Sequence, residues 1–275
     1  MPLSRFKVVA KTKNVIILLF FNHIFLYYSM DFSHKKLALL FSSGSFNPPH
    51  IGHLSMFELA RDYLISHGYY VLGGIMSPVG DDYKKKKPTL TCSRHRIRMV
   101  DLSVTEYPFV KCSNWEANQK KWVPAKEALE EHLAALHKVV QDPDQQLKNH
   151  PYFPEIVKSL RIEQVTNSTK FKMFLVCGGD LLERISIENE NEYIESMMKQ
   201  FGLIVTDRLG SMPQMCIKNH RILNAYKNNI HVLPETIPAQ ISSTKIREAV
   251  RHNLSVKFFV PDPVIQYISN NDLYL

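Results

Sequence analysis

The chain has 275 residues, of which 45% are hydrophobic and 22% are charged. A chain of this length buries a substantial core, and these fractions exclude a disordered protein and a membrane protein with many spans. The net charge of +8 suits polyanionic ligands such as nucleotide phosphates, but it is too small to indicate nucleic acid. Four scattered cysteines without metal-like spacing lead us to expect reduced thiols in an intracellular protein.

Residues 1–36 precede the rest of the fold as an apolar leader or extension. Residues 15–28 are apolar, a run that is short for a membrane span, which needs about 20 residues. Three interpretations stay open: an anchor or secretion signal, an atypical organelle-targeting leader, and an upstream extension with translation starting at Met30. The stretch lacks both the Arg/Ser content of a transit peptide and a small-residue cleavage pattern. We expect membrane contact only if residues 15–28 are retained.

The next segments predict a βαβ unit. Residues 37–43 are a short continuous apolar run, typical of a parallel strand covered on both faces. Apolar residues then recur at helical spacing over residues 51–65, and residues 69–76 indicate a second strand. Such a unit implies a right-handed crossover and a doubly wound sheet.

The remaining sequence continues the alternation, so we predict one α/β domain over residues 37–275. A lysine-rich loop covers residues 77–90, and a polar, proline-containing excursion covers residues 141–169. The predicted helices are 93–105, 125–140, 191–200, 242–251 and 263–270. The predicted strands are 109–112, 171–177, 203–206 and 230–233.

The sharpest feature is the segment GSFNPPHIGH at residues 44–53, between the first strand and the first helix. Ligands of doubly wound sheets bind there, outside the carboxyl ends of the strands. Gly44 permits close approach of the backbone, and a helix N-terminus favours an anion. His50 and His53 are three residues apart, so both can donate hydrogen bonds to phosphate oxygens. A lone histidine more often caps or packs, but H-x-G-H after a strand and a glycine turn indicates function.

A second segment, ISSTKIR at residues 241–247, predicts another anion-binding helix start. Ser242 is a suitable N-cap, and the helix beginning at Ser243 has a dipole that favours an anion. Thr244 and Arg247 are three residues apart, so a hydroxyl, backbone amides and a guanidinium can meet one phosphate group. Alone, this pattern also fits an ordinary capped helix. Together with the histidine segment it predicts a triphosphate held from two sides.

Four segments in order carry a resemblance to a known family. Two of them are the segments at residues 44–53 and 241–247. The other two are SPVGDDYKKKK at residues 77–87 and CGGDLLE at residues 177–183. Together they closely resemble the eukaryotic nicotinamide/nicotinic acid mononucleotide adenylyltransferases over about residues 37–274, whereas H-x-G-H alone indicates only a wider nucleotidyltransferase superfamily. The resemblance implies a Rossmann-like doubly wound parallel sheet of the nucleotidyltransferase type. It also implies transfer of AMP from ATP to either mononucleotide, which forms NAD or deamido-NAD and pyrophosphate.

The resemblance further implies roles for individual residues. His53, with His50 and Arg247, would carry catalysis. The ATP contacts would come from Gly44, Ser45, Phe46, His50, His53, Lys85, Thr244, Lys245, Ile246 and Arg247. The mononucleotide and dinucleotide contacts would come from Ser45, Phe46, Tyr83, Trp115, Gly178 and Asp180, with Trp115 stacking on the nicotinamide ring. Each has a plain alternative: a lysine run is usually a solvated loop, Trp115 also fits a core position, and Asp180 also fits a helix N-cap.

The sequence departs from the family at the second wall of the nicotinamide pocket. The family commonly carries a second Trp after CGxDLLE, whereas residues 187–193 contain none; Tyr193 is the candidate substitute. The excursion at 141–169 also lacks a basic nuclear-localisation cluster. The compartment therefore stays open among cytoplasm, nucleus and mitochondrion.

The expected chemistry needs no protein nucleophile. Mg²⁺ should bridge substrate phosphates without a dedicated protein metal site, and ATP is a substrate. We expect small-molecule nucleotides as partners, no nucleic acid, and a homo-oligomer. Two rival functions remain: another transferase of the superfamily, such as a pantetheine-phosphate adenylyltransferase or a cytidylyltransferase, and a non-catalytic chaperone or binding protein on the same scaffold.

Overall fold

A computed structural model describes residues 7–11, 15–20, 23–28, 36–141, 171–188, 190–207, 210–234 and 241–275. The excursion predicted at 141–169 lies outside these ranges beyond Gln141. Within them, the four cysteines are free thiols, as the sequence predicts.

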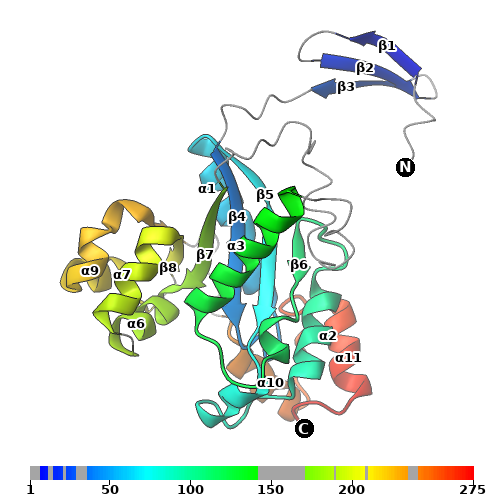
Figure 1. The fold of residues 1–275 in the computed structure, drawn as a ribbon. Coiled ribbons are helices and arrows are strands. Elements are labelled where there is room, and N and C mark those ends of the chain that lie inside the picture. The colour runs from blue at the N-terminus through cyan, green and yellow to red at the C-terminus, as the bar shows by residue number, and fades with distance from the viewer. Residues whose placement is uncertain are drawn as a thin grey trace.

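The centre of the fold is a six-stranded parallel sheet with the order β6–β5–β4–β7–β8–β9 (Figure 1). The first three strands of this sheet, β4 to β6, follow one another outward in one direction, and the last three, β7 to β9, follow one another in the other. The order therefore reverses between β4 and β7, which confirms the predicted doubly wound sheet. The strands are β4 (Lys36–Gly44), β5 (Tyr69–Pro78), β6 (Val110–Cys112), β7 (Phe171–Gly178), β8 (Gly202–Asp207) and β9 (Ile230–Pro234).

The strand β4 is apolar at every central position because both of its faces are covered. Leu37, Leu39 and Phe41 belong to one core cluster, while Ala38 and Leu40 belong to a second cluster on the opposite face. All five side chains are fully buried. The continuous apolar run that predicts this strand is thus the consequence of two cores meeting at one strand.

Helices cover both faces of the sheet, with α3 in front and α1 behind it (Figure 1). The helix α1 packs Phe57, Ala60 and Leu64 into the second cluster, whereas α3 and α6 pack into the first. The helices are α1 (Ile51–Ser66), α2 (Ser93–Ser103), α3 (Ala125–Gln141), α6 (Gly179–Glu188), α7 (Asn191–Gln200), α8 (Pro213–Asn219), α9 (Arg221–Ala225), α10 (Ser243–Arg251) and α11 (Asp262–Asn270). Short 3-10 helices are η2 (Asp81–Lys85), η3 (Glu116–Asn118) and η5 (Lys227–Asn229).

The predicted strands and helices are confirmed to within a few residues, but α6, α8 and α9 are not predicted by the sequence analysis. The helix α6 begins directly at the end of β7 with Gly179, a residue that favours a turn over a helix. Its buried residues, Leu182 and Ile185, show the helical spacing of three. The helices α8 and α9 are only 7 and 5 residues long, too short for a periodic pattern to develop.

A third apolar cluster joins α10 and α11 to α2. Ile246 of α10 and Val264 and Ile268 of α11 pack with Met99 of α2. This cluster holds the C-terminal helices beside the segment that follows β5, although more than 140 positions separate them in the chain. The start of α10 is thereby brought to the carboxyl ends of the strands.

The N-terminal segment forms a separate antiparallel sheet of β1 (Lys7–Lys11), β2 (Val15–Phe20) and β3 (His23–Tyr28). The apolar run at 15–28 is therefore divided between two paired strands. Among the described residues, no helix has both the length and the apolar character needed to span a membrane.

Candidate active site

A cavity of about 250 Å³ opens at the carboxyl ends of β4 and β7, where the strand order reverses. Ligands of open α/β sheets bind at this point. Four separate parts of the chain form its wall. The lining residues are Ser42, Ser43, Gly44, Ser45, Phe46, His50, His53, Met56, Lys87, Cys177, Gly178, Asp180, Leu181, Arg184, Ser242, Ser243 and Thr244.

The turn after β4 is held by packing of an aromatic ring against a glycine. Phe46 has a positive φ of 44°, and its ring lies over Gly44, where an added Cβ would approach it to 3.1 Å. The same ring makes an edge-on contact with the imidazole of His53, with 5.1 Å between centroids. A side chain at position 44 would press against the ring of Phe46 and shift it, and this ring in turn contacts His53.

The two histidines of the H-x-G-H segment stack on one side of the start of α1, as predicted. Their ring centroids are 3.7 Å apart, and His50 occupies the N-cap position. The backbone N–H of His50 donates to Nδ1 of His53 over 3.1 Å. Because Nδ1 accepts this hydrogen bond, the proton of the neutral His53 ring is carried by Nε2.

The loop between β4 and α1 is fixed by Asn47, which is fully buried. Its side-chain amide donates to the carbonyl of Thr89, and its Oδ1 accepts from the hydroxyl of Tyr274. The Asn47–Pro48 peptide bond is cis. Residues far away in the chain thus hold the loop that presents the histidines.

A buried arginine, Arg96 of α2, provides the second anchor of this loop. Its guanidinium donates to the carbonyls of Ser45, Val79 and Thr91 and lies 3.5 Å from the carboxylate of Asp81. Burial lowers the pKa of Arg96, and Asp81 partly offsets that effect. Arg96 carries no signal of this role in the sequence, since an arginine in an amphipathic helix gives no sign of being buried.

The start of α10 joins the same loop from the other end of the chain. Ser242 accepts a hydrogen bond from the N–H of Lys245, which confirms it as the N-cap. Ser243 Oγ donates to the carbonyl of Pro48 over 2.9 Å, and Thr244 lines the cavity together with His53. The two helix starts that the sequence predicts to act together therefore share one cavity.

Other residues of this segment lie behind the cavity wall. Arg247 is nearly buried; its Nη1 donates to the carbonyl of Asn47 and its Nη2 donates to Thr244 Oγ1. Burial lowers the pKa of Arg247. The side chain of Ile246 is part of the third apolar cluster, and that of Lys245 is exposed and lines a separate apolar groove.

The lysine loop contributes Lys87 to the cavity rather than Lys85. The Lys87 ammonium lies 3.3 Å from Ser45 Oγ, whereas the side chain of Lys85 is 80% exposed and pairs with Asp82. Burial lowers the pKa of Lys87, and Arg247, Arg184 and Arg96 lower it further. The four consecutive lysines are equivalent in sequence, and the 3-10 helix η2 decides which of them turns inward.

The opposite wall is formed by the end of β7 and by α6. Gly178, Asp180 and Arg184 line the cavity, and Arg184 donates to the hydroxyl of Tyr83 over 3.0 Å. Tyr83 also lies beside Trp122, with 6.1 Å between ring centroids. Asp180 and Tyr83 are predicted from the sequence as nucleotide contacts, whereas Arg184 and Trp122 carry no such signal in the sequence.

Comparison with known proteins identifies the family. A family model described as Cytidylyltransferase-like matches residues 41–249. The nicotinamide/nicotinic acid mononucleotide adenylyltransferase 1 of Bos taurus is 36% identical over 261 residues, which cover 89% of this chain and 91% of that protein. The corresponding enzymes of Oryza sativa and Arabidopsis thaliana are 37% and 35% identical, over 87% and 90% of this chain and 87% and 94% of their own lengths. This chain belongs to the nicotinamide/nicotinic acid mononucleotide adenylyltransferase family.

The fold of this family member also matches solved structures. The Plasmodium falciparum nicotinic acid mononucleotide adenylyltransferase complexed with NaAD has a TM-score of 0.56 and 15% identity, over 88% of this chain and 98% of that one. The same enzyme complexed with APC has a TM-score of 0.55 over the same shares, again at 15% identity. The shared fold and the family membership make this chain a nucleotidyltransferase.

In this adenylyltransferase the aromatic residue predicted to stack on the pyridine ring lies at the edge of the first core. Trp115 is half-buried and meets the ring of His132 edge-on at 5.9 Å. Tyr193, the candidate for the missing second Trp, packs on the same core, and its hydroxyl accepts from the N–H of Lys126. Neither residue is part of the cavity wall that contains the histidines.

A buried carboxyl lies directly behind the cavity. Glu116 is 1% exposed and accepts hydrogen bonds from Ser43 Oγ at 2.8 Å and Ser77 Oγ at 2.9 Å. Burial raises the pKa of Glu116 to about 7, although the two serines and Arg96 act in the opposite direction. This carboxyl ties the carboxyl ends of β4 and β5 together and orients Ser43 in the cavity wall.

Proposed function

We propose that this enzyme transfers the adenylyl group of ATP to nicotinamide mononucleotide or nicotinic acid mononucleotide, as the names of its relatives state for those proteins. The observation that carries the proposal is the meeting of two helix starts, α1 and α10, at one cavity at the switch point of the sheet. Each helix start favours negative charge, so the pair suits a triphosphate held from two sides.

The reaction forms one bond and breaks one. A phosphate oxygen of the mononucleotide attacks the α-phosphorus of ATP, and the bond from that phosphorus to the oxygen bridging to the β-phosphate breaks, releasing pyrophosphate. No covalent intermediate on the protein is needed. The protein aligns the two nucleotides and neutralises the charge that develops on the phosphates.

We assign the neutralising groups from the geometry of the cavity. His53 donates from Nε2 to a phosphate oxygen, since its Nδ1 is occupied by the backbone of His50. Lys87 and Thr244 supply an ammonium and a hydroxyl from other parts of the wall. Arg247 holds Thr244 and the loop in position and adds positive charge from behind. Backbone groups of Ser45 and Phe46 contact the nucleotides.

The acceptor binds towards α6 in this proposal. Asp180 lies in the first turn of that helix and lines the cavity. A carboxylate there accepts hydrogen bonds from ribose hydroxyls. Gly178 lets the mononucleotide approach the backbone, and Tyr83 closes this end through its contact with Arg184.

Mg²⁺ would fit this site as an ion held mainly by the substrate. Asp180, which this proposal assigns to the ribose hydroxyls, is the single carboxylate in the cavity wall of the described residues, so substrate phosphates and water would supply most of the ligands of Mg²⁺. Among the described residues there is no group of three or more His, Cys, Asp or Glu that would hold a metal. When bound, the ion would supply positive charge to offset the negative charge of the triphosphate and of the pyrophosphate that leaves.

The test is an acceptor assay. The purified chain is incubated with ATP, Mg²⁺ and one of three acceptors: nicotinamide mononucleotide, nicotinic acid mononucleotide or 4′-phosphopantetheine. We expect pyrophosphate and a dinucleotide with the first two and neither with the third. Turnover with 4′-phosphopantetheine but with neither mononucleotide would contradict the proposal. Turnover in a parallel assay with CTP in place of ATP would contradict it as well. Absence of turnover with every pair would favour a binding protein.

A further inference from the structure

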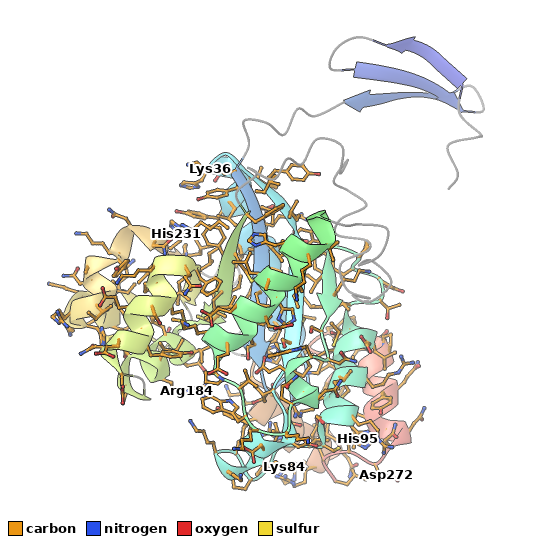
Figure 2. The ribbon with its side chains drawn as sticks, viewed as in Figure 1. Lys36, Lys84, His95, Arg184, His231 and Asp272 are labelled. Atoms are coloured by element: carbon orange, nitrogen blue, oxygen red, sulfur yellow. The ribbon has the colours of Figure 1, made fainter. Side chains whose placement is uncertain are left out.

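Arg184 is a residue of the cavity wall that the proposed phosphate chemistry does not use. It lies one turn after Asp180 on α6, and positions four apart share one face of a helix. That face is fixed because Leu182 and Ile185 on the other side of α6 are buried. Figure 2 shows Arg184 at the same end of the molecule as Lys84 of the lysine loop and far from Lys36, where β4 begins.

Within the part of the chain that the structure describes, the guanidinium of Arg184 forms no ion pair with a carboxylate, although Asp180 lies on the same face of α6. Its hydrogen-bond partner is the neutral hydroxyl of Tyr83, which takes one of the five N–H groups of the guanidinium. The side chain is exposed at the cavity. Arg184 therefore presents a charged, planar donor to whatever occupies this end of the site.

Arg184 lines the same cavity as the groups that suit the triphosphate, but it does so from the wall that α6 forms. His53 and Thr244 come from α1 and α10, and the loop before α1 links these two helices. Arg184 instead comes from α6, which packs on the opposite face of the sheet together with α3. Trp115, the aromatic residue expected near the pyridine ring, packs against that same cluster. The location of Arg184 on α6, one turn after Asp180, thus points to the acceptor, which the proposed function places at this wall.

We propose that Arg184 recognises the carboxylate of nicotinic acid mononucleotide and makes this enzyme prefer the acidic acceptor over the amide. This inference rests on the proposed function. A carboxylate accepts two parallel N–H bonds from a guanidinium, whereas a carboxamide offers one acceptor oxygen and turns an NH₂ donor towards the same cation. Arg184 thereby discriminates between two acceptors that differ in a single group.

The experiment compares the two acceptors in the wild type and in Arg184→Gln. We expect kcat/KM for nicotinic acid mononucleotide to fall about ten-fold, the scale of one charge-assisted contact at an exposed site. For nicotinamide mononucleotide we expect a change of less than about two-fold, and the KM for ATP should stay the same. Arg221→Gln, on the remote helix α9, is the matched control for loss of one positive charge. In this control, kcat/KM for each of the two acceptors should stay at its wild-type value.

Calorimetric binding of each mononucleotide supplies a readout that does not need turnover. A loss of affinity for the acidic mononucleotide alone supports the role of Arg184 even if the chain proves inactive, an outcome that would defeat only the proposed adenylyl transfer. Equal losses with both acceptors, together with a raised KM for ATP, would assign Arg184 to phosphate and overturn the proposal. Unchanged values for both acceptors would reduce Arg184 to a structural contact of Tyr83 and overturn it as well.

Discussion

The guanidinium of Arg247 donates to the carbonyl oxygen of Asn47 over 2.8 Å, although the two residues are 200 positions apart in the chain. Asn47 belongs to the loop that presents the histidines, and Arg247 belongs to the helix whose start forms the other side of the cavity. One hydrogen bond therefore couples the two halves of the proposed triphosphate site.

Replacement of Arg247 by Met should lower both stability and turnover. The carbonyl of Asn47 would be left without its donor in a buried position, which costs about 1–3 kcal/mol of unfolding free energy. Urea unfolding and steady-state kinetics measure the two effects. Arg251→Met, one turn further along α10 and exposed, is the control and should leave both unchanged. If Arg247→Met had wild-type stability, the hydrogen bond from Arg247 to Asn47 would contribute nothing to the free energy of unfolding.

Replacement of His53 by Ala should reduce turnover by about a hundred- to a thousand-fold, the usual loss for one preorganised donor to a developing charge. The fold should remain, because His53 lies at the cavity wall and not in the apolar core. Thermal unfolding checks the fold, and His252→Ala at the exposed end of α10 serves as the control. Unchanged turnover would refute the role of His53.

The pair Lys87→Met and Lys85→Met distinguishes the lysine chosen by the structure from the one chosen by the resemblance. Lys87 lines the cavity, and we expect its loss to lower kcat/KM for ATP by roughly ten- to a hundred-fold. Lys85 is exposed and paired with Asp82, so its loss should change kcat/KM by less than about three-fold. A larger loss of kcat/KM in Lys85→Met than in Lys87→Met would mean that the loop rearranges when ATP binds.

The raised pKa of Glu116 predicts that the free energy of unfolding falls as the pH rises. Its pKa is raised to about 7 in the folded protein from an ordinary value of 4.5, so the folded state binds more protons than the unfolded state between these values. Its contribution to the free energy of unfolding is therefore complete below about pH 4.5 and is lost as the pH rises through about 7. The loss amounts to about 3 kcal/mol, since one pKa unit corresponds to about 1.4 kcal/mol.

The variant Glu116→Gln tests this dependence, because a neutral amide cannot titrate. Urea unfolding at pH 4.5, 6 and 8 should show a smaller fall in unfolding free energy in the variant than in the wild type. Glu127→Gln, at an exposed position on α3, should keep the wild-type dependence. Parallel curves for the wild type and Glu116→Gln would show that the carboxyl does not titrate in this range.

Much of the fold follows from patterns that lie within short stretches of the chain. Apolar runs such as residues 37–43 predict strands covered on both faces, and helical periodicity predicts α1, α3 and α7. The start of each anion-binding helix is equally local, because an N-cap such as Ser242 acts on the amides that follow it. The helix α6 escaped this reasoning, since its glycine start resembles a turn.

The sequence by itself determined the doubly wound class, the two helix starts and the family, because each depends on residue order within one segment. Only the tertiary structure decided which lysine faces the cavity, that Arg96 and Glu116 are buried behind it, and that Arg184 donates a hydrogen bond to Tyr83. These contacts join residues that are as many as 101 positions apart. Their geometry follows from how α2, α6 and the lysine loop pack around the sheet, and no pattern within a single segment encodes that packing.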